Sequence, residues 1–375
     1  MKMTRTVLTV RGVHPGGGDR RSPRRANARV GRGARRRRPG RAAHDRHRGL
    51  REAEFSIVRG SLTYLFSTAE TRATFERQPA KYEIQNGGLC ARMGRTATGN
   101  PSDYLVHDGK IYIFGSDECH KRFAAAPAKY LIPPPAAMPD SPAEVARGRK
   151  TIDRVVAAFG GAARVDAVTS YVETASQLQK GPQGDVAITQ KTIVSFPNGV
   201  RIERTAVMPT RTTASATLLT PAGAWFIAQE RAFPIAQAAL PNLQQETGRQ
   251  IVSLLKARGQ ADFKVAALGA QSVEGTQVER VRIRRGPVDV VLGIDLSSER
   301  LHSTMFTDRH ADGEVGTYTI VYSDFRNVDG LVLPFTRHAL FNGAPDASQA
   351  WTVSTVLVNT VLEPGLFAAP SAGGQ

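Results

Sequence analysis

The sequence has 375 residues, 41% of them hydrophobic, and a formal net charge of +17. Residues 1–51 contain 17 of the 50 Lys and Arg side chains but two of the 33 acidic ones, so most of the excess positive charge belongs to this segment. The rest of the chain is nearly neutral, which argues against a nucleic-acid partner for the folded part. No run of 18 apolar residues occurs, so the sequence predicts no membrane-spanning helix.

The first 51 residues show neither the helical nor the strand period of apolar residues, and they include the run Arg35–Arg38. Such a segment cannot bury enough apolar surface to offset its chain entropy, so we expect residues 1–51 to be disordered. Three interpretations stay open. A nucleic-acid-binding arm would carry aromatic residues that stack on bases, and a secretory signal would carry an apolar stretch of about 7–15 residues. We favour a mis-assigned start, because GC-rich DNA read in a wrong frame yields Arg, Gly, Pro and Ala; a true signal peptide would then be missing.

A unit of the sequence is repeated at an offset of 48 residues. The segment Tyr64–Glu70 recurs as Tyr112–Glu118, and Pro79–Tyr82 recurs as Pro127–Tyr130. Each copy reads as a β-hairpin followed by a helix that stops at the proline. A ββα unit of this size is too small to be secure alone, so we expect the copies to share one core. The aromatic members of that core would be Phe66, Phe75, Phe114 and Phe123.

The second copy carries a specific pattern, Tyr-x-Phe-x-Ser from Tyr112, then Cys119, a phenylalanine four residues later and Pro-x-x-Tyr. This pattern resembles the YHS domain, and the segment Gly87–Ala91 resembles exported members of that family. The resemblance covers about residues 54–132, within a duplicated domain that we place at 52–132. It implies an exported location and a role in handling heavy metals.

The resemblance also implies metal-binding positions. Cys90 matches the first cysteine of the family pattern and Cys119 the last, but Gly115 stands where the middle cysteine is expected, and Thr71 replaces the helix cysteine in the first copy. Two thiolates do not close a tetrahedral site, so copper or zinc would need a further donor, for which His120 is the candidate. The alternative is that the two cysteines form a disulfide or are buried thiols, with His120 on the solvated surface.

A proline-rich linker at residues 133–140 separates this domain from a second one, which we place at residues 141–370. Ser141 and Glu144 form a capping box for a helix whose apolar stripe ends at Phe159. Residues 371–375 would be a disordered tail.

Short segments that alternate apolar and polar residues follow from Ser170 onward, interrupted by one helical stretch at residues 240–258. The turns between them are too short for crossover helices, so the strands should be antiparallel. We therefore expect a large curved sheet of about ten strands with two helices as a lid. A half-barrel of this kind can enclose an apolar cavity.

A second resemblance covers about residues 145–370. The matching segments are Phe159–Gly161, Phe196–Arg204, Gly223–Trp225, Tyr322–Pro334 and Val358-Asn359. They are similar to the exported lipoprotein-carrier-like proteins of the outer-membrane lipoprotein-sorting type. The resemblance implies a half-barrel fold, a periplasmic or otherwise exported location and a lipid or other hydrophobic ligand. Trp225 and Phe226 would line the cavity.

An enzyme would need a nucleophile or an acid–base pair in a motif. The sequence has no Gly-x-Ser-x-Gly, His-Glu-x-x-His or phosphate-binding loop, and His302, His310 and His338 are scattered over the predicted strands. The sequence therefore predicts a non-catalytic α+β protein with tandem YHS-like ββα units before a half-barrel with a helical lid. Its expected function is to bind a hydrophobic ligand, and the alternative is heavy-metal binding or sensing through the YHS-like module.

Overall fold

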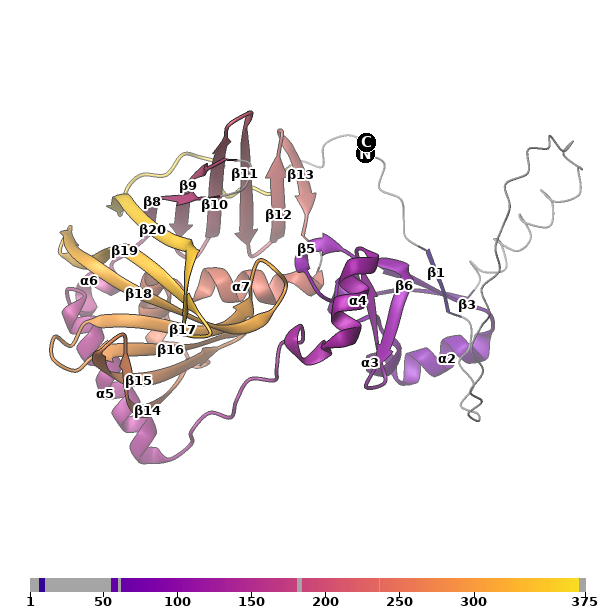
Figure 1. The fold of residues 1–375 in the computed structure, drawn as a ribbon. Helices are drawn as coiled ribbons and strands as arrows, with labels where there is room; N and C mark the ends of the chain where they lie inside the picture. The colour runs from indigo at the N-terminus through magenta and orange to yellow at the C-terminus, as the bar shows by residue number, and fades with distance from the viewer. Residues whose placement is uncertain (1–6, 11–54, 60–61, 181–183, 236, 371–375) are drawn as a thin grey trace, which may run out of the picture. The chain divides into compact units, whose positions relative to one another are not determined.

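The computed structural model describes residues 7–10, 55–59, 62–180, 184–235 and 237–370. The chain divides into two compact units (Figure 1). Residues up to 121 belong to the first unit, except 92–94, which belong with residues 122–375 to the second. The division falls inside one helix, several residues before the predicted linker. The predicted tail at residues 371–375 lies outside the described residues.

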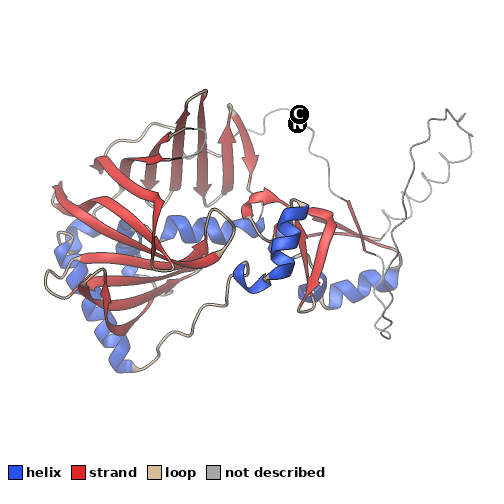
Figure 2. Cartoon of the chain, in the orientation of Figure 1, coloured by secondary structure: helices blue, strands red, loops and turns tan. Residues whose placement is uncertain are grey.

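The first unit contains two hairpins, each followed by a helix (Figure 2). The strands β2 and β3 pair antiparallel, as do β6 and β7. The elements are β1 (Val7–Val10), β2 (Ser56–Arg59), β3 (Leu62–Phe66), α2 (Ala69–Arg77), α3 (Pro79–Tyr82), η1 (Gln85–Gly88), β4 (Leu89–Cys90), β5 (Gly94–Thr98), β6 (Asn100–His107), β7 (Lys110–Phe114) and α4 (Asp117–Ala125), and the short helix η2 (Pro127–Lys129) follows α4. Helices α2 and α4 both begin and end 48 residues apart, so the repeat in the sequence is a repeat in structure.

The two copies pack against each other. Ile113 of the second copy belongs to the same buried cluster as Tyr64, Phe66 and Phe75 of the first. Phe114 and Phe123 are also fully buried. The two copies therefore share part of a core through Ile113, but the cluster does not include Phe114 or Phe123, so the single core expected for all four phenylalanines is confirmed only in part. Membership of the YHS family stays a prediction.

The prediction of a disordered N-terminal arm is wrong for one short stretch. Residues Val7–Val10 form β1, which pairs parallel with β3, so that β3 is the central strand of a three-stranded sheet. The sequence Val-Leu-Thr-Val is rich in β-branched residues, and its backbone groups complete the free edge of β3. The other residues of this predicted arm lie outside the described part of the chain.

The predicted linker at residues 133–140 and the following Ser141 contain no helix or strand. Helix α5 (Pro142–Ala158) starts at the predicted cap, where the Ser141 side chain accepts a hydrogen bond from the Glu144 amide. Helix α6 (Ala162–Asp166) follows across Gly160, whose positive φ of 114° suits glycine. The predicted start and end of the first helix are therefore confirmed.

The rest of this unit is dominated by one antiparallel sheet, which has thirteen strands in the described residues. The strands are β8 (Ser170–Gln179), β9 (Val186–Ser195), β10 (Gly199–Met208), β11 (Arg211–Thr220), β12 (Gly223–Ala228), β13 (Arg231–Pro234), β14 (Lys264–Val273), β15 (Thr276–Arg285), β16 (Val288–Asp295), β17 (Leu301–Arg309), β18 (Val315–Val328), β19 (Leu331–Phe341) and β20 (Ala344–Val358). The first strand, β8, pairs with the last, β20, and the free edges are β13 and β14. The sheet is therefore open, as a half-barrel requires.

One face of this sheet, here named the helix-side face, packs against the helices. The shared core contains Ile152 of α5, Phe159 at the C-terminal cap of α5 and Leu255 of α8 (Ile251–Lys256), together with inward residues of β8, β9 and β14–β20. The sheet has two ends, and strands β10–β13 at one end are named the β10–β13 arm. Figure 1 shows α7 (Leu240–Gly248) between this arm and strands β14–β18 of the other end. The opposite face is named the outer face.

The sheet has thirteen strands in the described residues, whereas about ten were expected, and two further details differ. The helical stretch predicted at residues 240–258 is interrupted at Gln250, whose backbone is extended, so α7 and α8 are separate and the short helix η4 (Ala257–Gly259) follows. Strand β13 was not predicted, because four residues that end in a proline show no readable alternation. The short helix η3 (Gln237–Ala239) joins β13 to α7.

Candidate functional site

The register of the sheet shows which side chains share the helix-side face. Val194 of β9 belongs to the core formed with the helices, and it pairs with Val200 of β10, which packs on the same core. Alternation along β10 then places Ile202 on that face. Ile202 pairs with Thr217 of β11, which pairs with Phe226 of β12. These pairings continue the helix-side face into the β10–β13 arm without a register shift.

Two aromatic rings lie on this face at the free edge of the sheet. Phe226 pairs with Phe233 of β13, and the two residues are 43% and 44% exposed. Large apolar side chains on the core-facing side of a sheet are normally covered, so this exposed pair is the clearest apolar binding surface on the arm. The side chains are displayed on a rigid ladder, which fixes their spacing.

Trp225 does not share this surface. Neighbouring residues in a strand point to opposite faces, and Trp225 pairs with Leu218 on the outer face. Trp225 and Phe226 therefore cannot line one cavity together, contrary to the sequence-based expectation. The ligand-binding role predicted for Phe226 stays a prediction, and its structural partner is Phe233, which the sequence analysis missed.

Arginine side chains flank the aromatic pair on the same face. Arg204 lies two residues beyond Ile202 on β10, and Arg231 lies two residues before Phe233 on β13. Both are exposed. We name Arg204, Phe226, Arg231 and Phe233 the aromatic–arginine patch. The alternation of apolar and polar residues in the sequence could not predict this patch, because its members come from three different strands.

The row of paired residues that contains Phe226, Thr217 and Ile202 continues across the sheet to an ion pair on β8. Glu173 of β8 pairs with Thr192 of β9, which pairs with Ile202. The Glu173 carboxylate accepts a hydrogen bond of 2.7 Å from the Tyr171 hydroxyl and forms an ion pair with Arg337 of β19. Burial, followed by the charge of Glu173, raises the pKa of Tyr171 well above its ordinary value, so this hydroxyl stays a hydrogen-bond donor.

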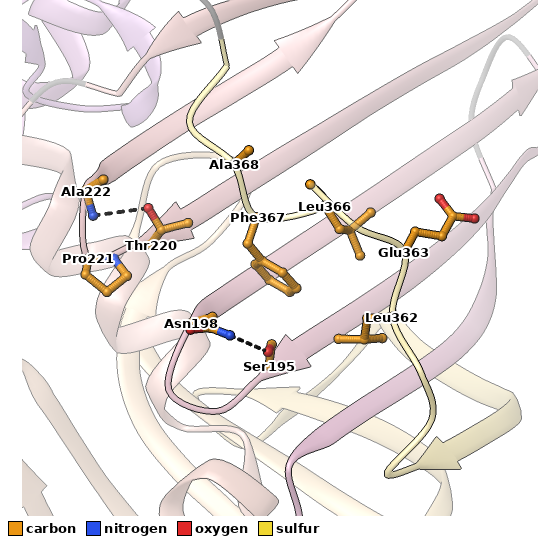
Figure 3. Close-up of a pocket in the computed structure, with 11 residues that line it drawn as sticks. Ser195, Asn198, Thr220, Pro221, Ala222, Leu362, Glu363, Leu366, Phe367 and Ala368 are labelled. Atoms are coloured by element: carbon orange, nitrogen blue, oxygen red, sulfur yellow. Dashed lines mark hydrogen bonds between the residues drawn. The ribbon is translucent and has the colours of Figure 1, made fainter.

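An open cleft of about 510 Å³ lies between the C-terminal segment and the turns at one end of strands β9 to β12 (Figure 3). Leu362, Leu366 and Phe367 of the C-terminal segment face the β9–β10 and β11–β12 turns there. The Asn198 side chain donates to Ser195 Oγ at 3.2 Å within this cleft. Ser195 neighbours Val194 in β9, so it lies on the outer face, and the cleft is separate from the aromatic–arginine patch.

The predicted metal ligands lie in the first unit. Cys90 and Cys119 are buried thiols and not a disulfide. His120 is partly buried: its ring stacks on Phe114 at 4.6 Å and its Nδ1 bonds to the Asp103 carboxylate. Across the described residues, no group of three or more His, Cys, Asp or Glu side chains has the geometry to hold a metal ion. The structure therefore does not gather Cys90, Cys119 and His120 into a three-ligand site.

His302 and His338, which the sequence suggested were scattered, both interact with Glu274. His338 Nε2 lies 2.8 Å from Glu274 Oε2, and the charge of Glu274 also acts on His302. Burial is the main cause that lowers the pKa of His302. The neighbouring hydroxyl of Ser303 is fully buried, so it offers no accessible nucleophile beside these groups.

None of the helices in the described residues is long and apolar enough to cross a membrane. No protein-family model matches the sequence. No curated protein is similar to it at a significant level.

The chain is similar to several solved structures at low identity. A domain of an outer membrane lipoprotein-sorting protein from Vibrio parahaemolyticus aligns with a TM-score of 0.39 and 14% identity, over 60% of this chain and 97% of that one. A LolA superfamily protein from Nitrosomonas europaea aligns with a TM-score of 0.39 and 14% identity, over 57% and 95%. A DUF1329 family protein from Desulfovibrio piger aligns with a TM-score of 0.37 and 11% identity, over 60% and 97%.

Proposed function

We propose that the half-barrel of the second unit binds a lipid or other hydrophobic ligand without transforming it. The observation that carries the proposal is the in-register pair Phe226 and Phe233, exposed on the face of the sheet that elsewhere forms the core. A ligand that covered both rings would remove apolar surface from water.

The energetic scale fits a binding protein. Because Phe226 and Phe233 are already more than half covered, burying the rest of each side chain contributes about 1 kcal/mol, and each buried methylene of an acyl chain adds about 0.8 kcal/mol. Association costs at least several kcal/mol in lost freedom, so two rings need a ligand with a chain of several methylenes. Such a ligand would be held without a covalent step.

Lipid extraction and mass spectrometry of the purified protein, followed by titration with a fluorescent fatty-acid probe, test this proposal. We expect Phe226→Ala/Phe233→Ala to weaken probe binding at least tenfold. The matched control is Val207→Ala, since Val207 is 49% exposed but alternates with Ala206 and so lies on the outer face. Extracts without lipid, together with a protein that ignores the probe, would exclude the proposal.

A second candidate function is heavy-metal binding by the first unit. Its supporting observation is the Asp103–His120 hydrogen bond, because metal-binding histidines commonly donate their second ring nitrogen to a carboxylate. His120 Nε2 would then be the metal ligand, with the thiolates of Cys90 and Cys119. A shift of these side chains would be required to bring them together.

Titration with Co²⁺ tests the second candidate, since thiolate coordination gives a charge-transfer band. Cys119→Ser should abolish the band and His120→Ala should change its d–d spectrum. A titration without any thiolate band would remove this candidate and leave the hydrophobic-ligand proposal untouched.

The exported location that both sequence resemblances imply is also part of the proposed function. Fractionation of cells that express the protein would test this location.

A further inference from the structure

The aromatic–arginine patch carries more positive than negative charge. Arg231 forms no ion pair among the described residues, and it lies beside Phe233 at the free edge of the sheet. Arg204 donates to Gln190 Oε1 at 2.7 Å, and its nearest carboxylate is Glu246 of α7 at 4.0 Å. The patch therefore carries two guanidinium groups, and the ion pair between Arg204 and Glu246 is a long one.

The positions of the two arginines follow from the register. Arg204 pairs with Ser215, and Ser215 pairs with Ala228, which pairs with Arg231. Both arginines thus lie in one cross-strand row, and the phenylalanine pair lies in the next row on the same face. Neighbouring strands are about 4.8 Å apart, so three strand steps separate the guanidinium-bearing positions by about 14 Å. Small residues occupy the two positions between them, which leaves both side chains free to lean over the row.

From this arrangement we infer that the ligand of the half-barrel is an anionic amphiphile, with an acidic head group held by Arg204 and Arg231 and an acyl chain on Phe226 and Phe233. The inference rests on the proposed function and specifies the class of its ligand. Arginine binds carboxylate and phosphate oxygens through charge-assisted hydrogen bonds, often in pairs. The rings beside it supply the apolar contact that a free anion cannot use. A neutral lipid would leave the excess positive charge of the patch unmatched.

Equilibrium dialysis of three radiolabelled ligands that share one acyl chain tests the inference: palmitate, 1-palmitoyl-lysophosphatidate and 1-palmitoylglycerol, each below its aggregation concentration. The full chain would be compared with Arg204→Gln and Arg231→Gln. Arg201→Gln is the matched control, because Arg201 lies on the same strand but on the outer face, where it pairs with Glu203 at 2.7 Å.

We expect each patch variant to weaken at least one acidic ligand about three- to tenfold, as the loss of one charge-assisted contact implies, and to leave the neutral glyceride within about twofold. Binding of the acids should also fall between low and high salt, because the patch is exposed. A dependence on both arginines for lysophosphatidate alone would identify the head group as a phosphate, whereas the same dependence for palmitate would extend it to carboxylates.

Equal binding of all three ligands, unaffected by either arginine substitution, would overturn the inference while the hydrophobic-ligand function survived. An equal effect of Arg201→Gln would overturn it too, because a general charge effect would then explain the result. A protein that bound none of the three ligands would count against both the inference and the proposed function.

Discussion

Gly148 of α5 lies directly against the backbone of Ala266 in β14. A Cβ atom at position 148 would be 2.9 Å from Ala266 Cα, closer than two such atoms can pack. This close approach lets α5 cover the β14 edge of the sheet. Glycine in the middle of a helix is otherwise unfavourable by about 1 kcal/mol relative to alanine.

The two effects predict opposite signs for Gly148→Ala. Helix propensity alone would stabilise the protein, whereas the contact with β14 should destabilise it by about 1–3 kcal/mol through overpacking. Chemical denaturation would measure the change, with the exposed neighbour substitution Arg149→Ala as control. A more stable Gly148→Ala protein would show that α5 does not dock on β14 as described.

The shared core of the repeats predicts that a change in one copy destabilises the other. Ile113→Ala removes a fully buried side chain from the cluster that also contains Tyr64 and Phe75, so we expect a loss of about 2–5 kcal/mol. Val106→Ala is the control, because Val106 is 54% exposed on β6 of the same copy. Hydrogen exchange should show faster opening of β3 in Ile113→Ala. Faster exchange confined to β6 and β7 would contradict the shared core.

The buried pair of Glu173 and Arg337 predicts strong coupling between two distant positions. Arg337→Met leaves the carboxylate buried without its cation, and we expect a loss of about 3–5 kcal/mol. The double variant Glu173→Gln/Arg337→Met removes both charges and keeps an acceptor for the Tyr171 hydroxyl, so it should recover much of that stability. A double variant no more stable than Arg337→Met would show that the pair does not act as a unit.

An ion-pair cluster on β15 and β16 should make stability depend on acid pH. Burial alone would raise the pKa of Asp289, but hydrogen bonds from Arg282 at 2.8 Å and Arg284 at 2.9 Å outweigh it and hold the pKa below the ordinary value of 3.8. A lowered folded-state pKa means that the stabilisation is complete above pH 3.8 and is lost as the pH falls through the folded-state value.

Asp289→Asn should therefore cost about 1–3 kcal/mol at pH 7 and progressively less toward pH 2, where the wild-type carboxylate is protonated as well. The control is Asp324→Asn, since Asp324 also pairs with an arginine but is exposed. Urea denaturation at several pH values would measure both. A pH-independent difference for Asp289→Asn would contradict the assignment.

The two cysteines should behave as protected thiols. Cys90 is completely buried and Cys119 is 7% exposed, so a thiol reagent such as DTNB should react slowly with the folded protein and rapidly in denaturant. Two thiols per chain should be counted after unfolding under non-reducing conditions. A count of zero would mean that the cysteines pair in solution, as the alternative interpretation of the sequence allowed.

The sequence by itself determined the elements that depend on local chemistry. The 48-residue offset located helices α2 and α4, since similar patterns of caps, apolar faces and proline stops form similar local structure. Ser141 and Glu144 marked the start of α5, and alternation marked most strands of the sheet. Length, turn size and alternation together were enough to predict a large antiparallel sheet, because each of these is read from neighbours along the chain.

Only the tertiary structure decided which residues meet. Alternation along one strand places Trp225 and Phe226 on opposite faces, which the expectation of a common cavity lining overlooked, and the pairing with β11 was needed to assign Phe226 to the helix side. Phe233 and Arg231 lie on a strand too short to show a pattern, and Arg204 comes from β10, so their common surface depends on register between strands. Val7–Val10 forms a strand by pairing with β3, a contact that the local sequence does not reveal. Local propensity acts over a few residues, whereas register, the choice of covered face and the pairing of β8 with β20 are set by the packing of the whole sheet.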